Sequence, residues 1–472
     1  MHDNKLANTC EAALFWMLLS IIAWLPIPFG SNQGWSWSLM ELLVFTVASG
    51  VLVTRLIWPS PRINVISKLK LPLGLLIIWL GYHLIQVIPL PYAALAFFRP
   101  ASIELYRYLL GGDLSGAQTL SLDVNLTLQA LLKGAAYITL FLLVVLLVNN
   151  RQRLRQMAMM LVYVGVANAF FGLINYFTNG YFGYFNPASP WGFAVTGTYI
   201  NRNHFAGLME MCIPIALGLI LALQAKEQFY PTFKARLRGY LSFLLSSQSL
   251  LYLFTLVMLA ALLLSTSRGG IFSLLAALTT GVFLLKFMNS AAVSYRRIGS
   301  IIILFVVLVI GWFGLGNLES RLKMQGLEDN RSELRSATYS LIKDYPLIGT
   351  GAGTYEWIFP LYKTAELGGN IYEHAHNDYL ELLVNQGGAG LLTLGISILL
   401  LLWRILKALN GRRDPLLRGL LFGVVCGVVA MLTHALVDFN FQIPANAAIF
   451  WCLLGVGVSC ALMEHRRRRS HQ

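Results

Sequence analysis

The stretch HAHNDYLELLVNQGGAGLL (374–392) places two histidines, an asparagine and an aspartate directly before an apolar segment that contains glycines. A histidine side chain titrates near pH 6.5, so His376 can take a proton from a hydroxyl group that attacks a second molecule. Asp378, Glu373 or Glu381 lies near enough in sequence to orient the ring. The alternative is a loop histidine that is hydrogen-bonded to backbone.

His374 and His376 also form a His-X-His pair, which can chelate a metal ion in an extended loop. The spacing offers no third ligand, and no Asp-X-Asp pair is present to hold a divalent ion on a diphosphate. We therefore expect no metal and no other cofactor. His376 is the candidate base, and His374 and Asn377 are assigned supporting roles.

Two arginines lie at the ends of apolar segments, where small or polar residues surround them. Arg202 stands between Asn201 and Asn203 in NRNHFAG, and Arg268 stands in STSRGG. An arginine at membrane depth costs about 2.5–3.5 kcal/mol on insertion scales, so it usually has a polar partner. Guanidinium groups match phosphate oxygens in shape and charge, which favours anion binding here. The alternative is an interfacial arginine that extends its charge into water.

Three further groups of residues are candidates for supporting roles. His434 and Asp438 are four residues apart on an expected helix and share one face, either as a helix-stabilising pair or as part of a site. Glu210 lies early in an apolar segment, where an arginine is its expected partner. Arg331 and Arg335 are one helical turn apart and form either a solvated face or a second anion clamp.

The composition shows what kind of element positions these residues. Of the 472 residues, 57% are hydrophobic and only 12% are charged, whereas soluble chains are about 25% charged. Apolar runs near 20 residues recur, each long enough to cross a bilayer core of about 30 Å, and they lack the alternation of a β-barrel. We predict an all-α polytopic membrane protein, one membrane domain over 1–472, with about twelve spans. The predicted spans are 12–29, 36–57, 71–91, 127–148, 157–177, 205–225, 249–267, 270–288, 300–316, 380–407, 418–437 and 446–463.

The basic residues predict the orientation of these spans. The net charge is +14, but the Lys and Arg residues lie in short runs between apolar segments, which indicates topology and not nucleic-acid binding. With both termini cytoplasmic, every inner connection carries Lys or Arg, as the positive-inside rule requires. The longest outer connection, 317–379, has helical spacing up to Asp344 and then meets Pro346 and a glycine-rich turn. The candidate chemistry therefore gathers on the outer face.

Five motifs in this order resemble those of the O-antigen ligase and O-antigen polymerase superfamily of bacterial envelope enzymes, over roughly 190–450. They are TGTYINRNHFAG, STSRGG, LIKDYPLIGTGAGTY, HNDYLELLVNQGGAG and HALVDFNFQIPANA. The ligase pattern of His-Asn, nine residues, Gly, two residues and Gly is met by His376, Asn377, Gly387 and Gly390. The Thr-Thr pair that often follows in ligases is replaced by leucines at 391 and 392, which favours a polymerase or exopolysaccharide-type transferase.

The resemblance implies an enzyme of the bacterial inner membrane whose active site faces the periplasm. Such enzymes transfer a glycan from undecaprenyl diphosphate to an acceptor hydroxyl, which belongs to a lipid A core in ligases and to another lipid-linked repeat unit in polymerases. The resemblance assigns the diphosphate to Arg202 and Arg268 and activation of the acceptor to His376. We expect inversion at the anomeric carbon without a metal. Expected partners are the lipid-linked donor, the glycan or lipid A core acceptor, membrane lipids and a chain-length regulator, but no nucleic acid.

Two other functions fit parts of the sequence. A transporter or flippase of lipid-linked glycans would explain many spans with intramembrane arginines, but it would favour two related halves with polar groups at the midplane. A relative that glycosylates protein would share the same donor chemistry. The sequence favours glycan transfer because its polar residues gather at one face and no internal repeat is apparent.

Overall fold

The computed structural model describes residues 2–59, 64–98, 100–109, 117–180, 194–223, 232–234, 238, 242, 246–287 and 318–463. Helices dominate these residues, and the two short strands among them, β1 (Pro89–Leu90) and β2 (Gln118–Thr119), pair antiparallel. Ten of the described helices are long and apolar enough to cross a membrane, and a shorter apolar helix accompanies them. The prediction of an all-α polytopic membrane protein is confirmed.

The helices follow the apolar runs of the sequence. The long apolar helices are α1 (His2–Trp24), α2 (Gly34–Ile57), α4 (Lys70–Val87), α7 (Val124–Leu147), α8 (Arg151–Phe177), α9 (Arg202–Ala222), α12 (Arg268–Phe287), α16 (Asp378–Gly411), α17 (Pro415–His434) and α18 (Pro444–Leu462). The shorter α11 (Ser247–Leu264) precedes α12. The predicted span 300–316 lies outside the described residues.

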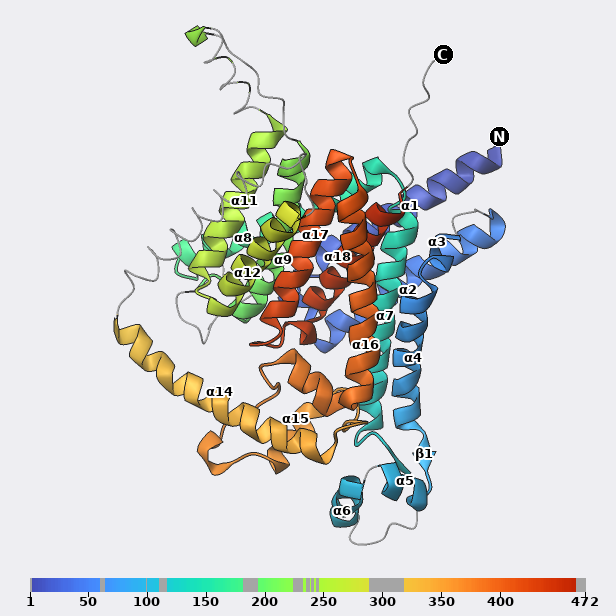
Figure 1. Ribbon diagram of the computed structural model, residues 1–472, viewed down its shortest axis with the longest axis vertical. Coiled ribbons are helices and arrows are strands. Elements are labelled where there is room, and N and C mark those ends of the chain that lie inside the picture. Colours follow the sequence, from blue (N-terminus) through green and yellow to red (C-terminus); the bar gives the residue numbers. More distant parts are fainter. Residues whose placement is uncertain are drawn as a thin grey trace.

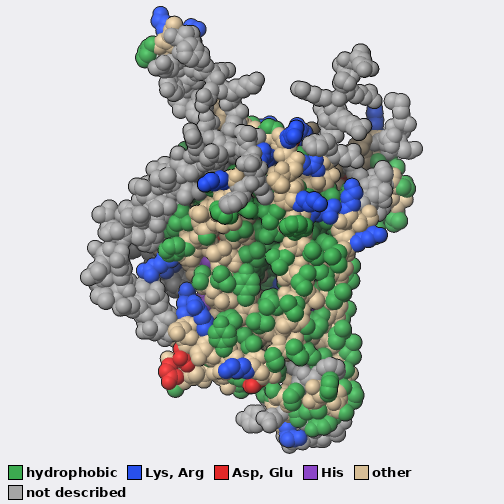
Figure 2. All heavy atoms as spheres, in the orientation of Figure 1, with side chains coloured by type: hydrophobic (Ala, Val, Ile, Leu, Met, Phe, Trp, Pro, Cys, Tyr) green, Lys and Arg blue, Asp and Glu red, His purple; other side chains and the backbone are tan. Residues whose placement is uncertain are grey.

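The bundle has two chemically different ends. The start of α1 and the end of α18 lie together at one end, shown at the top of Figure 1. Figure 2 shows Lys and Arg side chains gathered toward that end, above a broad hydrophobic surface. We call it the basic end. The starts of α9, α12, α16 and α18 lie at the opposite end, which we call the site end.

Helix α9 lies at the centre of the bundle, and its side chains are almost all buried. It crosses α17 where glycines allow the two backbones to touch. A Cβ atom added to Gly218 would lie 2.3 Å from the carbonyl oxygen of Gly419, and one added to Gly423 would lie 2.5 Å from that of Pro214. Small residues are what permits such close approach between membrane helices. The crossing therefore fixes the start of α9 beside the end of α17.

The long connection before α16 is partly helical, as the sequence predicts. Helix α14 (Leu318–Asp344) ends at Asp344, and the short helices α15 (Tyr355–Ile358), η3 (Phe359–Leu361) and η4 (Ala365–Leu367) follow. These elements lie beneath the helix bundle in Figure 1. Their apolar side chains, including Leu341 and Tyr355, form a core of their own with Leu380 and Val384 of α16. The connection thus packs onto the first turns of α16.

Helix α16 is kinked at Gly387, which has a φ of 62°. The atoms nearest to Gly387 and Gly390 belong to the loop after α14 and to α16 itself, and not to a neighbouring span. A Cβ atom on Gly387 would lie 2.3 Å from the backbone of Leu347, so the glycine admits the loop after α14. A Cβ atom on Gly390 would meet the side chain of Gln386 in its own helix.

Polar side chains from α4 hold the kink and the loop together. Tyr82 donates from its hydroxyl to the carbonyl of Ile348 at 2.7 Å, and Gln86 donates to the same carbonyl at 2.9 Å. The indole of Trp79 donates to the Gln386 side chain at 2.6 Å. These bonds fix the direction in which the first turns of α16 leave the bundle, and so they set the position of the residues that precede Asp378.

Candidate active site

The start of α9 carries the first predicted arginine. Asn201 caps the helix, because its side chain accepts a hydrogen bond of 2.8 Å from the backbone of Asn203. Arg202 is half-buried, and its guanidinium donates to the hydroxyl of Thr266 at 2.7 Å. Thr266 has a φ of 54° in the tight turn between α11 and α12. The turn therefore holds the Arg202 side chain at the site end.

The second predicted arginine, Arg268, is the first residue of α12 and is also half-buried. Its charge and that of Arg331 both act on Arg202, which places all three cations within electrostatic range of one another. Like charges brought together in a protein are costly unless an anion joins them. Arg268 and Arg331 of α14 thus both lie within electrostatic range of Arg202.

Asn203 connects the arginine segments to the end of α17. Its side-chain carbonyl accepts a hydrogen bond of 2.9 Å from Ser267, and its amide donates to Oδ2 of Asp438. Ser267 in turn accepts from the backbone of Gly270 at 3.3 Å and so caps α12. A single amide side chain therefore fixes three segments that are far apart in the sequence.

The start of α16 brings the predicted base into the same cluster. Asn377 caps the helix by accepting from the backbones of Tyr379 and Leu380, each at 3.0 Å, and it donates to the carbonyl of Leu436 at 2.8 Å. His376 directly precedes this cap with a φ of 48°, a conformation that is uncommon outside glycine. Its Nδ1 lies 3.6 Å from Oδ1 of Asp438.

Asp438 is the carboxylate at the centre of the cluster and is almost fully buried. Burial alone would raise its pKa. The neighbouring His376, His204 and His434 instead hold the pKa of this carboxyl well below its ordinary value. The amide of Asn203 and the backbone N–H of Phe439 also donate to it. Asp438 is therefore an anion that faces Nδ1 of His376.

Phe439 forms an aromatic wall beside this carboxylate. The ring of His374 stacks on it at a centroid distance of 4.3 Å, and the rings of His204 and His376 meet it edge-on at 4.6 and 4.8 Å. Three histidine rings thus pack against the same phenylalanine ring. The sequence reasoning missed His204 and Phe439, although both stand inside motifs that it quoted, because neither residue type at those positions suggests a chemical role alone.

The three carboxylates that were expected to orient His376 do not pair with it in the structure. Glu381 binds His374 at 2.9 Å and the backbone of Ala375 at 3.0 Å. Asp378 accepts from the backbone of Phe441 at 3.0 Å and anchors the loop after α17. Glu373 is exposed. The carboxylate nearest to His376 is Asp438, which lies too far along the chain for local spacing to reveal.

The roles expected for Glu210 and His434 are also corrected. The carboxylate of Glu210 lies 3.1 Å from Nδ1 of His434, so its partner is this histidine and not an arginine. His434 is the last residue of α17, and Asp438 lies beyond the helix end, so these two do not form a pair along one helical face. The buried Glu210–His434 pair ties α9 to α17 just inside the cluster.

Arg331 and Arg335 lie one turn apart on α14 and are both half-buried. Arg331 lies within electrostatic range of Arg202 and His434. The anion clamp of Arg331 and Arg335 stays a prediction. Among the described residues, no group of three or more His, Cys, Asp and Glu side chains is arranged to hold a metal ion.

Fold and site together define a polytopic membrane protein with a histidine–carboxylate pair and a set of arginines at one end of its bundle. Residues 253–395 match the family model described as O-antigen ligase. This match confirms the resemblance to the O-antigen ligase and polymerase superfamily. It includes Arg268 and His376, whereas Arg202 and Asp438 lie outside the matched residues. No curated protein matches the chain.

Proposed function

We propose that this protein is a glycosyltransferase that moves a glycan from undecaprenyl diphosphate to an acceptor sugar hydroxyl at the periplasmic face of the inner membrane. The single observation that carries the proposal is the His376–Asp438 pair beside Arg202 and Arg268. The family match supports this class of reaction, because the family is described as O-antigen ligase.

In the proposed reaction, the acceptor oxygen forms a bond to the anomeric carbon while the bond from that carbon to the diphosphate oxygen breaks. The proton of the acceptor hydroxyl passes to Nε2 of His376, and Asp438 stabilises the imidazolium through Nδ1. The electron pair of the broken bond leaves on undecaprenyl diphosphate. Attack opposite the leaving group inverts the anomeric configuration.

Arg202, Arg268 and Arg331 supply the positive charge that the departing diphosphate requires. Fixed donors that face a developing charge lower the barrier, and loss of one typically slows a reaction about 10²- to 10³-fold. The chemistry is proposed to be independent of a metal ion. Transfer that persists in excess chelator is therefore expected, and transfer that stops in chelator and returns with a divalent ion would contradict this part.

The test is reconstitution of the purified protein in proteoliposomes with an undecaprenyl diphosphate-linked glycan and candidate acceptors. Chain elongation without added lipid A core indicates a polymerase, which the sequence favours, and transfer only to lipid A core indicates a ligase. Transfer to an added acceptor protein indicates protein glycosylation. Movement of the donor between leaflets with no new glycosidic bond would overturn the proposal in favour of a flippase.

A further inference from the structure

At the basic end, far from the histidine–carboxylate cluster, an open cavity of about 750 Å³ lies between the start of α4 with its preceding residues, α16 and the end of α18. Five cations line it: Lys68, Lys70, Arg404, Lys407 and Arg412. No acidic side chain is among the described residues that line it. The positive-inside rule accounts for cations at this end of the bundle. That rule does not require five cations to line the same cavity.

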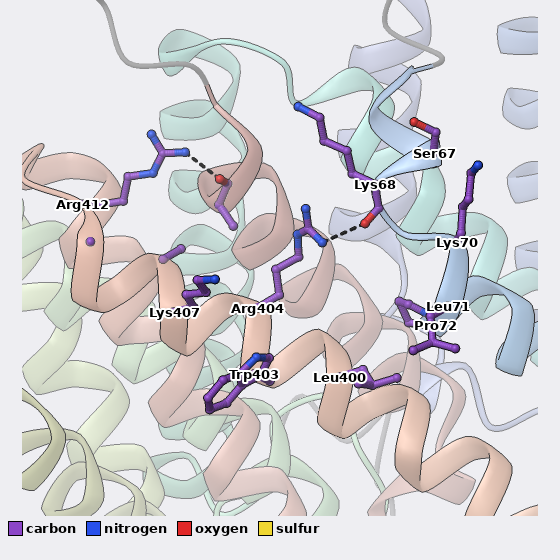
Figure 3. A pocket seen from close by; sticks show the side chains of 13 residues that line it. Ser67, Lys68, Lys70, Leu71, Pro72, Leu400, Trp403, Arg404, Lys407 and Arg412 are labelled. Atoms are coloured by element: carbon purple, nitrogen blue, oxygen red, sulfur yellow. Dashed lines mark hydrogen bonds between the residues drawn. The ribbon is translucent and has the colours of Figure 1, made fainter.

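Two of the cations are held in place by backbone carbonyls. Arg404 donates to the carbonyl of Lys68 at 2.7 Å, and Arg412 donates to that of Ala461 at 2.6 Å. Figure 3 shows both bonds; Arg404 lies in the last turns of α16, and Arg412 directly follows the end of that helix. Each guanidinium has five N–H groups, so a bond to one carbonyl leaves donors for a ligand. Two of the five cations that line the cavity are thus fixed in position.

The lining of the cavity changes from charged to apolar along the helix axes. Leu71 follows Lys70 toward the membrane interior on α4, and Leu400 and Trp403 precede Arg404 on α16. Leu71 and Trp403 are 64% and 67% exposed, so an apolar surface adjoins the cations (Figure 3). About 16 Å of helix separates Leu400 from Gly411 at 1.5 Å per residue. This length accommodates a headgroup together with the upper part of its acyl chains.

We propose that this cavity binds the phosphate headgroup of an anionic phospholipid of the adjacent leaflet. The expected ligand is a phosphate anion joined to an apolar chain, because the cations and the exposed Leu71 and Trp403 form one continuous surface. Basic pockets between membrane helices bind lipid headgroups in this way. Free phosphate would use the cations but leave the apolar part of the site unfilled. The inference is independent of the proposed glycan transfer.

The test is native mass spectrometry of the detergent-purified full chain titrated with dioleoylphosphatidylglycerol, with dioleoylphosphatidylcholine as the zwitterionic match. Phosphatidylglycerol is expected to bind and phosphatidylcholine is not. One cation near a membrane surface changes lipid affinity about fivefold, so Lys70→Gln with Lys407→Gln together weaken binding roughly 30-fold. Both lysines are exposed, so the folded protein is expected to persist.

Arg413→Gln is the matched control, because Arg413 is exposed at the same end but does not line the cavity. Its affinity for phosphatidylglycerol is expected to equal that of the parent protein. Equal binding of the two lipids, or an unchanged affinity in the double lysine variant, would overturn the proposal. A third arm adds inorganic phosphate. Displacement of phosphatidylglycerol by millimolar phosphate would assign the site to free phosphate and overturn the lipid assignment.

Discussion

Nδ1 of His376 lies 3.6 Å from Oδ1 of Asp438, although 61 positions of sequence separate the two residues. The distance is longer than a hydrogen bond and short enough for an ion pair once the ring is protonated. Because of this contact, the environment of His376 at the start of α16 depends on the position of the loop after α17. It also makes Asp438 a positioning residue for the proposed base.

Asp438→Asn is expected to slow glycan transfer about 10²- to 10⁴-fold while leaving the fold intact, because asparagine keeps the size of the side chain but not the charge that stabilises the imidazolium. The rate is measured in proteoliposomes with the lipid-linked donor. The KM for the donor should change much less than kcat. Asp344→Asn is the control, because Asp344 is an exposed carboxylate at the end of α14 that bonds Tyr362. A normal rate in Asp438→Asn would remove this pair from the mechanism.

Thr266→Val is expected to reduce transfer by about tenfold, since it removes the hydroxyl that holds the Arg202 guanidinium at 2.7 Å but leaves the arginine in place. The effect should appear in the KM for the lipid-linked donor. Thr280→Val serves as the control, because Thr280 bonds only a backbone carbonyl within α12 at 2.8 Å. If Thr266→Val behaves like the control while Arg202→Ala abolishes transfer, the turn does not position the arginine.

The contact between His374 and Glu381 predicts that the stability of the site end depends on pH. Burial alone would lower its pKa, but the charge and hydrogen bond of Glu381 raise it above the ordinary value. A raised pKa means that the stabilisation is fully present below about pH 6.5, the unfolded value, and is lost as the pH rises through the folded value. The melting temperature should therefore fall over this interval.

His374→Phe should remove this contribution to the pH dependence, because phenylalanine retains the stacking on Phe439 and has no titrating group. Melting temperatures of the parent and the variant are compared from pH 5.5 to pH 9, and NMR of the ring protons reports the titration directly. Parallel curves for the two proteins would show that the pair with Glu381 contributes nothing to stability.

Gly387→Ala is expected to destabilise the protein by about 1–3 kcal/mol, because the added methyl group meets the backbone of Leu347 and the φ of 62° is unfavourable for alanine. Gly395→Ala is a control in the same helix, since no atom lies within 4 Å of the added Cβ and alanine favours a helix. Thermal unfolding in detergent measures both. Equal melting temperatures would mean that the kink relaxes without cost.

The sequence predicted the class of fold and the principal candidates because both depend on local patterns. Runs of apolar residues are sufficient to predict membrane helices, and unusual side chains at their ends mark Arg202, Arg268 and His376. Asp438 could not be assigned to His376 in advance, because its neighbour in sequence, His434, offered a closer partner. The partner of Glu210 was missed for the same reason. Helix packing, which joins α9 to α17, decided both pairings.

The kink at Gly387 could not be predicted either. A glycine in an apolar run fits helix packing equally well, and only the backbone of the loop at Leu347 shows why no side chain is tolerated there. The bridging role of Asn203 was hidden in the same way. Its capping neighbour Asn201 has a local explanation, whereas its bonds to Ser267 and Asp438 depend on the tertiary structure.

The contact of Gly218 with Gly419 lies deep in the bundle, about four turns of α9 away from Arg202. Because the two backbones meet there, α9 cannot slide along α17 by one residue without placing a side chain into the crossing. Such a slide would move Arg202 by about 1.5 Å relative to Asp438. The spacing between Arg202 and Asp438 is thus set deep inside the bundle, by two residues that have no side chains.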